Sequence, residues 1–574
     1  MHNWRLNRYE IYILCIIIML ALFLRVMGIW WGVPSSEKAS FFYQYPASEA
    51  YNIPEIGEAL HSYHADEPKI LQAISNMNPS EFDLNPHLFI YPTLYIYMVA
   101  GALEVASIFN MIVLNPLKEF YFLYPDQMGK FYLIGRIVTV ILGLLTVYIT
   151  YIIGKRMYNK WVGIIAGLIL ALLPLHVVHS KYMSVDVPTT FWIVLSVLCA
   201  IRIEGSRGYK WYILSGLTAG LATATKYYAI LVVISIFMAH YLNSHNGLDN
   251  KCFFKVFRNN RIAIVCIMTI AGFFIGSPYV FLSPTEFYSG AILHHIDSIV
   301  GGEENYDMIY GHFKYPFLFH VYASLFIGMG PFLWFLALAG VAYSLIRHKK
   351  SDLIIFSFII PYYLMIGISF LRPMRYSIPL LPFMAIVSAR LIFDIYQSMD
   401  VVSWKKIVRG AYISFMGLIM AYTLMDSLAY GLMMSQKDNR DKAAKWIIEN
   451  VDKRSTIGIT RAQGFFSVPL NPNSYQIKVI GFDRQLFKKV EPDYFVMSEF
   501  EYREFLRLRT KYPKKAEFID QLVSGKFQFN DFKYDTIWFE SRPKISGLDF
   551  GHRYPPHDWL YPFPKVVILK KERL

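Results

Sequence analysis

The chain has 574 residues, of which 55% are hydrophobic and only 17% are charged, and its mean hydropathy is +0.34. A soluble protein of this length carries about a quarter charged residues, so the composition excludes an ordinary soluble protein. The formal net charge of +14 could indicate nucleic acid binding. Much of the excess, however, lies in short segments between apolar runs, such as 154–160 (GKRMYNK) and 347–350 (RHKK), as is typical of cytoplasmic loops. We therefore expect an α-helical polytopic membrane protein that binds membrane lipids and no nucleic acid.

The first apolar run follows Arg5 and Arg8 and continues through Trp30 and Trp31 without a small-residue cleavage site. We interpret it as a retained span rather than a removed signal peptide. With the N-terminus in the cytoplasm, about eleven crossings place every basic loop inside. The expected spans are residues 11–31, 131–153, 161–179, 187–203, 211–225, 228–242, 262–281, 317–346, 353–370, 377–395 and 408–431.

The first outer loop, residues 32–130, contains a further apolar stretch at 88–114. Counting this stretch as a crossing would move the basic segment 154–160 outside and reverse every later loop. The charge pattern therefore favours a juxtamembrane helix that lies in the outer interface, rich in Tyr and bounded by prolines. The alternative is an ordinary span with a local exception to the charge rule.

The chain changes character after residue 431, which divides it into a transmembrane domain (1–431) and a soluble extracytoplasmic domain (432–574). Helical spacing is found at 441–450, with Asp441 as a possible N-terminal cap, and at 498–512. Apolar and β-branched runs predict strands at residues 456–460, 475–480, 493–498, 535–540 and 565–571. This mixture predicts a small α/β or α+β domain, and it contains no glycine-rich phosphate loop.

Two adjacent carboxylates, Asp66 and Glu67, stand in the first outer loop, flanked by His61 and His64. A carboxylate at the membrane surface can act as a general base if it reaches the proton of an attacking hydroxyl. The His-x-Asp-Glu pattern could also supply ligands for a divalent metal, formed by His61, His64 and Glu67. A solvated loop without chemistry is the simpler alternative.

Further polar residues fall on the same outer side of the predicted topology. Asp186 precedes an apolar helix and could simply mark its start. Cations near this boundary could each snorkel to the interface, but together with two or three carboxylates they suit the phosphate of an anionic lipid. These cations are Lys181, Lys226, Arg372, Arg375, Arg136 and Arg25.

Two other segments are candidates for covering this site. His294, His295 and Asp297 could line the same cavity as an acceptor-binding or cover loop, or serve only as an outer cover. Residues 550–564 (FGHRYPPHDWLYPFP), rich in prolines and aromatic residues, could fold back over the site and choose the acceptor.

An ordered series of segments resembles the type-C glycosyltransferases, in the branch that contains protein O-mannosyltransferases and the aminoarabinose transferase of lipid A. The resemblance covers roughly residues 1–430. It rests on a first span that ends in Arg25 and then, in order, on HADEP, YPTLYIY, GRIVTVILGLLTVYITYIIGKRMY, LPLHVVHSKYMSVDVPTTFW, GLTAGLATATKYYAIL and RPMRYSIPLLP.

The resemblance implies a polyprenyl-phosphate sugar donor that is used on the outer face. It matches Asp66 with the family's catalytic first-loop Asp, Glu67 with its neighbour, and Asp186 with the acidic residue after the third span. One departure is that the lipid A branch has Lys-Pro-Pro where this chain has Tyr91 before Pro92. The other cations must then hold the donor phosphate, and aminoarabinose transfer to lipid A is less favoured.

We therefore expect a hexosyl- or pentosyltransferase of the plasma (inner) membrane that transfers a monosaccharide with inversion, with Asp66 as the general base. The departing phosphate needs cations rather than a proton, so no cofactor is required, although a divalent metal stays possible. The acceptor can be a glycan, a lipid or a protein.

Three other functions stay open. An oligosaccharyltransferase of the same superfamily would want a Trp-Trp-Asp-Tyr-Gly-like sequence, which HDWLYP at 557–562 does not match. A lipid or polysaccharide transporter would favour inverted repeats, and none is evident. A receptor would not need about eleven spans.

Overall fold

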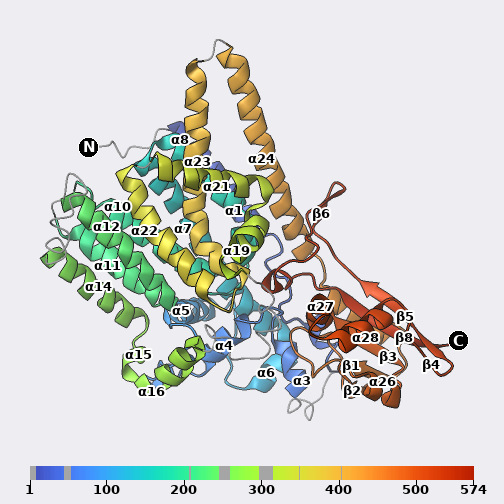
Figure 1. Cartoon of the computed structure of the whole chain (residues 1–574). Helices are drawn as coiled ribbons and strands as arrows, with labels where there is room; N and C mark the ends of the chain where they lie inside the picture. Colours follow the sequence, from blue (N-terminus) through green and yellow to red (C-terminus); the bar gives the residue numbers. More distant parts are fainter. Residues whose placement is uncertain are drawn as a thin grey trace.

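The structure, a computed structural model, describes residues 8–43, 54–205, 208–244, 259–296, 315–347, 349–401 and 404–574. A helical bundle is followed by a domain built on a β-sheet (Figure 1). Six of the described helices are long and apolar enough to cross a membrane, as expected for a multi-pass integral membrane protein. These six are α1 (Arg8–Val26), α7 (Pro125–Met157), η4 with α12 (Tyr227–Ser244), α22 (Lys350–Ile368), η8 with α23 (Met374–Ser398) and the helix that begins with α24 (Lys405–Met434).

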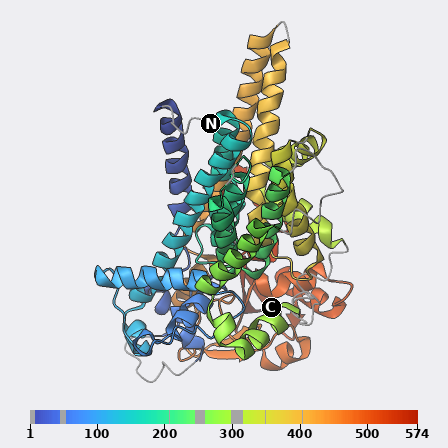
Figure 2. The same ribbon diagram turned by 90° about the vertical axis from the view of Figure 1, so that its left-hand side faces the viewer.

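Shorter apolar helices complete the bundle: α8 (Lys160–Leu172), α10 (Asp186–Ile201), α11 (Lys210–Thr223), α14 (Asn260–Gly276) and α21 (Pro331–Ile346). Each satisfies its backbone hydrogen bonds internally, as a segment in lipid must. The start of α1 and the sheet domain lie at opposite ends of the bundle, as the expected topology requires (Figure 2). The number of crossings and their sidedness stay predictions.

Two of the expected spans contain a break between helices. The segment expected at 161–179 ends its first helix at Leu172 and restarts as α9 (Pro174–His179). The segment expected at 317–346 breaks at Gly330, whose φ is +73°, between α20 (Phe326–Met329) and α21. In both cases a proline opens the second helix, and proline disfavours helical geometry at the residue before it.

The apolar stretch 88–114 contains α5 (Leu94–Ile108), which has 15 residues. Figure 2 shows α5 running across the direction of α7 rather than along it. This arrangement is the one expected of the interfacial helix. The rest of the described outer loop forms only short helices: α2 (Ser36–Ala39), α3 (Pro54–Gly57), η2 (Glu58–Leu60), α4 (Glu67–Ser75), η3 (Pro79–Glu81) and α6 (Lys118–Leu123).

The C-terminal domain is built on a six-stranded mixed sheet in the order β2–β1–β3–β8–β5–β4. The first three strands are parallel, whereas β8 runs antiparallel to both β3 and β5. Each of the five strands predicted from the sequence is present. The strands are β1 (Thr456–Ile459), β2 (Gln476–Val479), β3 (Tyr494–Ser498), β4 (Gln528–Phe529), β5 (Phe532–Phe539) and β8 (Val566–Arg573), and a separate hairpin pairs β6 (Lys544–Ile545) with β7 (Leu548–Asp549).

Helices cover both faces of this sheet because successive side chains of β8 point to opposite sides. Val566 and Ile568 pack in one cluster with α25 (Asn439–Asn450), and Val567 and Leu569 pack in another with α26 (Arg484–Val490) and α28 (Pro513–Val523). The N-terminal cap of α25 is Asp438, whose side chain accepts from the Arg440 amide, so the expected cap at Asp441 was wrong.

The first outer loop is tied to the C-terminal domain around α25. The Trp31 indole donates a hydrogen bond of 3.0 Å to Asp438, and the Tyr63 hydroxyl donates to Asp441. The Arg440 guanidinium lies 3.8 Å from the centre of the Tyr63 ring, which adds a cation–π contact. Because α24 continues to Met434, the expected domain boundary after residue 431 falls within its last turn.

Glycine allows α11 and α14 to pack closely, and this contact generates a first prediction. A Cβ atom on Gly220 would lie 2.2 Å from the Thr269 carbonyl oxygen. We expect Gly220→Leu to destabilise the bundle by about 1–3 kcal/mol, the usual cost of overpacking, and to lower Tm in detergent. Gly410→Leu is the matched control, because a Cβ there meets nothing within 4 Å. Equal Tm values for the two variants would contradict the close packing.

Candidate active site

Asp66 stands directly before helix α4, and its carboxylate faces a cation rather than the helix. It occupies the N-cap position, yet its side chain makes no capping hydrogen bond. Instead Oδ1 accepts from the Tyr91 hydroxyl at 3.2 Å, and Oδ2 lies 3.1 Å from Nη2 of Arg375. The Asp66 residue is only 6% exposed. The carboxylate is therefore buried, oriented and paired.

Arg375 is the centre of a cluster of charges from four separate parts of the chain. Besides Asp66 it lies 3.6 Å from Oδ2 of Asp186 and 3.8 Å from Oδ2 of Asp558. Asp186, the first residue of α10, also accepts a bond of 2.6 Å from Nζ of Lys226. Three carboxylates thus share two cations in a buried place, and this arrangement can hold a fourth negative group only by exchanging partners.

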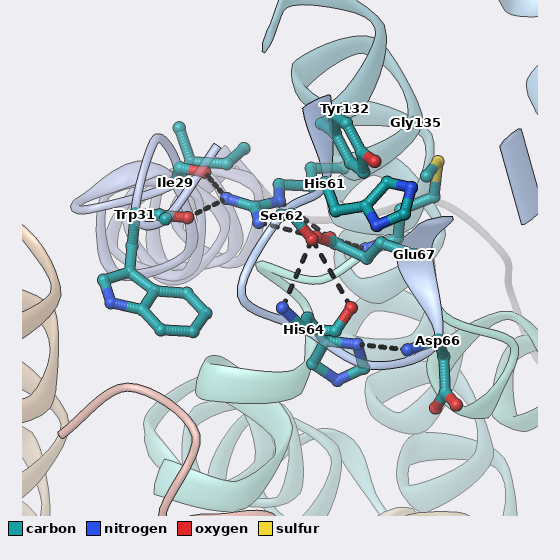
Figure 3. A network of polar contacts seen from close by, with 12 residues as sticks. Ile29, Trp31, His61, Ser62, His64, Asp66, Glu67, Tyr132 and Gly135 are labelled. Atoms are coloured by element: carbon teal, nitrogen blue, oxygen red, sulfur yellow. Dashed lines mark hydrogen bonds and ion pairs between the residues drawn. The ribbon is translucent and has the colours of Figure 1, made fainter. Parts of the chain in front are cut away.

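Glu67 has a different role from its neighbour, because it forms a buried ion pair with Arg136. The Nε and Nη2 atoms of Arg136 donate to its two carboxylate oxygens at 2.8 and 2.7 Å, and the Met183 amide donates at 2.7 Å. Arg136 also donates to the carbonyls of Ile29 and Trp31, and both charged side chains are fully buried. Figure 3 shows the Asp66 side chain pointing away from that of Glu67. The contacts of Arg136 therefore hold Glu67 and the segment after α1 in place.

The residues considered for a metal site do not converge. Nδ1 of His61 lies 3.4 Å from the Glu58 carboxylate, and Nδ1 of His64 accepts from the Asp66 amide at 3.3 Å (Figure 3). Glu67 is occupied by Arg136. Among the described residues there is no group of three or more His, Cys, Asp or Glu side chains placed to hold a metal ion. These three residues therefore do not fit a metal as they stand.

Four of the six predicted cations lie outside the cluster, because Arg136 pairs with Glu67 and Arg25 donates to the Ala21 and Ala171 carbonyls. Nζ of Lys181 donates to the Met27 carbonyl at 2.7 Å, and burial lowers the pKa of Lys181 to about 7. Arg372 donates from Nε to the Ser369 carbonyl at 3.0 Å. Of the predicted cations, the structure therefore brings Lys226 and Arg375 to Asp66 and Asp186.

His294 and His295 lie beside the residue that follows Lys226. The His295 ring is 5.5 Å from the Tyr227 ring and 5.7 Å from the His294 ring. Burial lowers the pKa of His295 to about 4, so it is neutral at pH 7. Asp297 lies outside the described residues. The role of this segment as an acceptor or cover loop stays a prediction.

The segment 550–564 folds back onto the site, and sequence reasoning missed its most important residue, Asp558. Both oxygens of Asp558 accept backbone amides, from Met374 and Arg375, at 3.0 and 3.1 Å. Trp559 and Tyr561 pack in the main core cluster of the bundle, and the Tyr561 ring lies 5.0 Å from the His64 ring. The sequence signal that could have identified Asp558 is an acidic residue within a run rich in aromatic residues and prolines.

The electrostatics keep Asp66 ionised. Burial by itself raises the pKa of Asp66, but the nearby positive charges, with Arg375 the largest of them, together outweigh it and hold the pKa well below the usual range. Burial raises the pKa of Tyr91 well above its usual value, so the Tyr91 hydroxyl keeps its proton and donates to Asp66. The site can therefore accept one proton at Asp66 and can pair an incoming anion with Arg375 and Lys226.

Comparison with solved structures shows a similar fold in an archaeal oligosaccharyltransferase. The chain matches the archaeal oligosaccharyltransferase AglB from Archaeoglobus fulgidus, solved with an inhibitory peptide and a dolichol-phosphate, with a TM-score of 0.50 and 13% identity. The match covers 97% of this chain and 75% of that one. The structure of ArnT from Cupriavidus metallidurans bound to undecaprenyl phosphate matches with a TM-score of 0.42 and 10% identity, over 87% of this chain and 95% of that one.

The sequence comparisons identify more particular relatives. Residues 98–275 match the family model described as dolichyl-phosphate-mannose-protein mannosyltransferase. A curated relative, dolichyl-phosphooligosaccharide-protein glycotransferase 2 from Pyrococcus furiosus, is 32% identical over 106 residues. That match spans 17% of this chain and 14% of the length of the relative.

The different contacts of the adjacent carboxylates generate a second prediction. Glu67→Gln leaves the Arg136 charge buried without its counter-charge, so we expect a loss of about 3–5 kcal/mol of stability and a lower Tm. Asp66→Asn should cost less, because Arg375 retains Asp186 and Asp558. The double variant Glu67→Gln/Arg136→Gln should recover part of the loss in a double-mutant cycle. A Tm for Glu67→Gln equal to that of wild type would contradict the buried pair.

Proposed function

We propose that this chain is a membrane glycosyltransferase that transfers a monosaccharide from a polyprenyl-phosphate donor to an acceptor hydroxyl. The observation that carries this proposal is the buried, ionised Asp66 beside the cations Arg375 and Lys226. The type-C fold and the match to a mannosyltransferase family over residues 98–275 support a sugar donor linked to a lipid phosphate.

In the proposed reaction the acceptor oxygen attacks C1 of the sugar from the side opposite the phosphate. The new C1–O bond forms as the C1–O bond to the phosphate breaks, so the configuration at C1 inverts. The acceptor proton passes to Asp66, and polyprenyl phosphate leaves with the electron pair of the broken bond. Because the departing phosphate gains a negative charge, it needs cations rather than a proton, and Arg375 and Lys226 are placed to supply them.

Donor binding prepares the base in this mechanism. In the described structure Arg375 is shared by Asp66, Asp186 and Asp558, and its charge lowers the pKa of Asp66. A donor phosphate that pairs with Arg375 shares that charge and so raises the proton affinity of Asp66. Base strength then increases when the donor is present, which is when a proton has to be accepted.

The expected setting is the plasma (inner) membrane, with a cytoplasmic N-terminus and the C-terminal domain outside. This side is proposed because the basic loops lie between the expected spans and the cluster lies at the end that carries the C-terminal domain. The proposed chemistry requires no cofactor. A divalent metal dependence is tested by adding EDTA to the assay described below.

An oligosaccharyltransferase is the second candidate, favoured by the fold match to AglB and by the Pyrococcus furiosus relative. It differs in its donor, which would carry an oligosaccharide rather than a monosaccharide. A transporter without chemistry is the third, and it differs in needing no bond to break. The three candidates are distinguished by the donor that the protein consumes: a lipid-linked monosaccharide, a lipid-linked oligosaccharide, or none.

The proposal predicts that Asp66→Asn abolishes transfer while the donor still binds. The purified chain in nanodiscs is given a panel of radiolabelled polyprenyl-phosphate monosaccharides, with a lipid-linked oligosaccharide included. Release of lipid phosphate and transfer of sugar are followed together with acceptor extracts. We expect a rate loss of at least about 100-fold in Asp66→Asn, as for removal of a general base, with donor binding retained.

Arg484→Gln is the control for this assay, because Arg484 is an exposed residue of the C-terminal domain far in sequence from the cluster. Full activity in Asp66→Asn, or consumption of no donor by wild type, would refute the transferase. Consumption of the oligosaccharide donor alone would favour the second candidate, and loss of turnover in EDTA would establish a metal.

A pH profile gives a further prediction. Because the pKa of Asp66 is lowered, the base stays ionised as the pH falls, and kcat/KM for the donor should stay level from pH 7 down to about 5. In Arg375→Gln the burial of Asp66 is no longer opposed by that charge, so its pKa rises and the residual activity falls on acidification at higher pH. Arg372→Gln removes an arginine that lies outside the cluster and should keep the wild-type profile. Identical profiles in the two variants would contradict the pairing.

A further inference from the structure

A cavity outside the Asp66 cluster lies between the bundle and the C-terminal domain. Its volume is about 870 Å³, and it is lined by residues of α19, η7 and α20 (Pro316–Met329), of α27 (Glu499–Arg507) and of the segment 552–557. A smaller cavity of about 370 Å³ shares Glu499, His552, Arg553, Pro555 and Lys565 with it. The two form one cleft.

The side of the cleft formed by the C-terminal domain is cationic. In the larger cavity this side is lined by one carboxylate, Glu499, and by five cations: Arg503, Arg507, Arg509, Arg553 and Lys565. Glu504 is shared by two of these residues, since it pairs with both Arg503 and Arg507. Arg553 is exposed and lies over the Tyr554 ring at 5.3 Å. Arg509 pairs with Asp520 and Lys565 with Glu540, so the excess positive charge rests on the exposed Arg553 and on the two arginines that share Glu504. Guanidinium groups of this kind suit a phosphate.

The opposite side of the cleft is apolar. It is formed by Phe319, Tyr322, Phe326 and Ile327 from the helices that run from Pro316 to Met329, one of the apolar segments of the bundle. Tyr322 is 49% exposed, and on the same helical segment Leu318 is 52% exposed. The apolar wall thus continues onto a surface that can meet lipid chains. A cationic wall facing an apolar wall complements an amphiphile with an anionic head.

The cleft also borders the catalytic cluster. His557 lines the cleft, and the next residue, Asp558, pairs with Arg375. A molecule held in the cleft therefore lies beside the neighbour of Asp558, and the partner of Asp558, Arg375, contacts Asp66 and Asp186. This places the cleft where an acceptor has to approach the proposed site.

We propose that this cleft binds the acceptor, and that the acceptor is a phosphate-bearing lipid. Its phosphate pairs with Arg503, Arg507 and Arg553, its acyl chains lie against Phe319 and Tyr322, and its sugar or glycerol hydroxyl is directed toward the Asp66 cluster. The acceptor role rests on the proposed transferase function, whereas the binding of the lipid does not.

Photolabelling tests the binding directly. The full chain in phosphatidylcholine nanodiscs is doped with phosphatidic acid that carries a diazirine in its acyl chain, or with diazirine phosphatidylcholine as the neutral probe. Labelled peptides are identified by mass spectrometry after irradiation. We expect phosphatidic acid to label residues 316–329 and the peptides of α27 at least about tenfold more than the neutral probe, the effect of a charge-assisted pair.

Arg553→Gln is the informative variant, because Arg553 is exposed and its loss does not disturb the core. It should reduce phosphatidic acid labelling about five- to tenfold, and Arg507→Gln/Arg553→Gln should reduce it further. Arg484→Gln/Lys488→Gln removes two positive charges elsewhere on the same domain, outside the cleft, and should label as wild type. Tm values of all variants identify any that fail to fold.

Equal labelling by the two probes, or labelling unaffected by Arg553→Gln, would overturn the proposal. So would displacement of the probe by millimolar inorganic phosphate, which would indicate a site for free phosphate, or by an acidic peptide, which would indicate a protein acceptor. Labelling needs no sugar donor, and Asp66→Asn should label as wild type. Labelling without donor turnover would therefore refute the transferase alone, and turnover without labelling would refute the cleft alone.

Discussion

The buried ion pair between Glu67 and Arg136 is the constraint on which the position of Asp66 depends. An arginine in the middle of an apolar helix has to find a counter-charge, and Arg136 finds it in the first outer loop. The same guanidinium binds carbonyls just after α1, so it joins α1, α7 and the start of α4 at one point. Asp66 and Glu67 are adjacent at the beginning of α4. Because Arg136 holds the Glu67 carboxylate on one side, the Asp66 carboxylate points away from it (Figure 3), toward Arg375.

Arg375 connects this fixed point to the rest of the molecule. It lies at the start of η8 and meets carboxylates from the first outer loop, from the start of α10 and from the C-terminal domain. The C-terminal domain is therefore part of the charge balance of the site. A phosphate that enters has to exchange with carboxylates that already occupy Arg375. In the proposed mechanism this exchange links donor binding to the proton affinity of Asp66.

The Asp66 cluster and the cleft suggest a division of labour between the domains. The bundle supplies Lys226, Arg375 and the buried carboxylates, which suit a donor phosphate presented from the membrane. The C-terminal domain supplies a second set of guanidinium groups above an apolar wall. Asp558 stands between the two sets. Replacing the C-terminal domain would then change the acceptor and would also remove Asp558 from Arg375.

Much of this could be predicted from the sequence, because hydropathy and loop charge are local properties. The apolar runs determined the membrane class and most helices, and the alternation of side chains determined the five main strands. The sequence also identified Asp66, Asp186, Lys226 and Arg375 as residues of one outer face. The sequence did not separate them from Lys181, Arg136 and Arg372. The charge of whole segments predicts the side of the membrane on which a residue lies, but the pairing of two side chains depends on the distance between them in the folded structure. Only the tertiary structure decided that Glu67 is a positioning residue and that Asp558, more than 180 residues after Arg375, completes the cluster. The physical reason is that a buried charge is stabilised by the particular partner within a few ångströms, and that partner is determined by how the helices and the C-terminal domain pack.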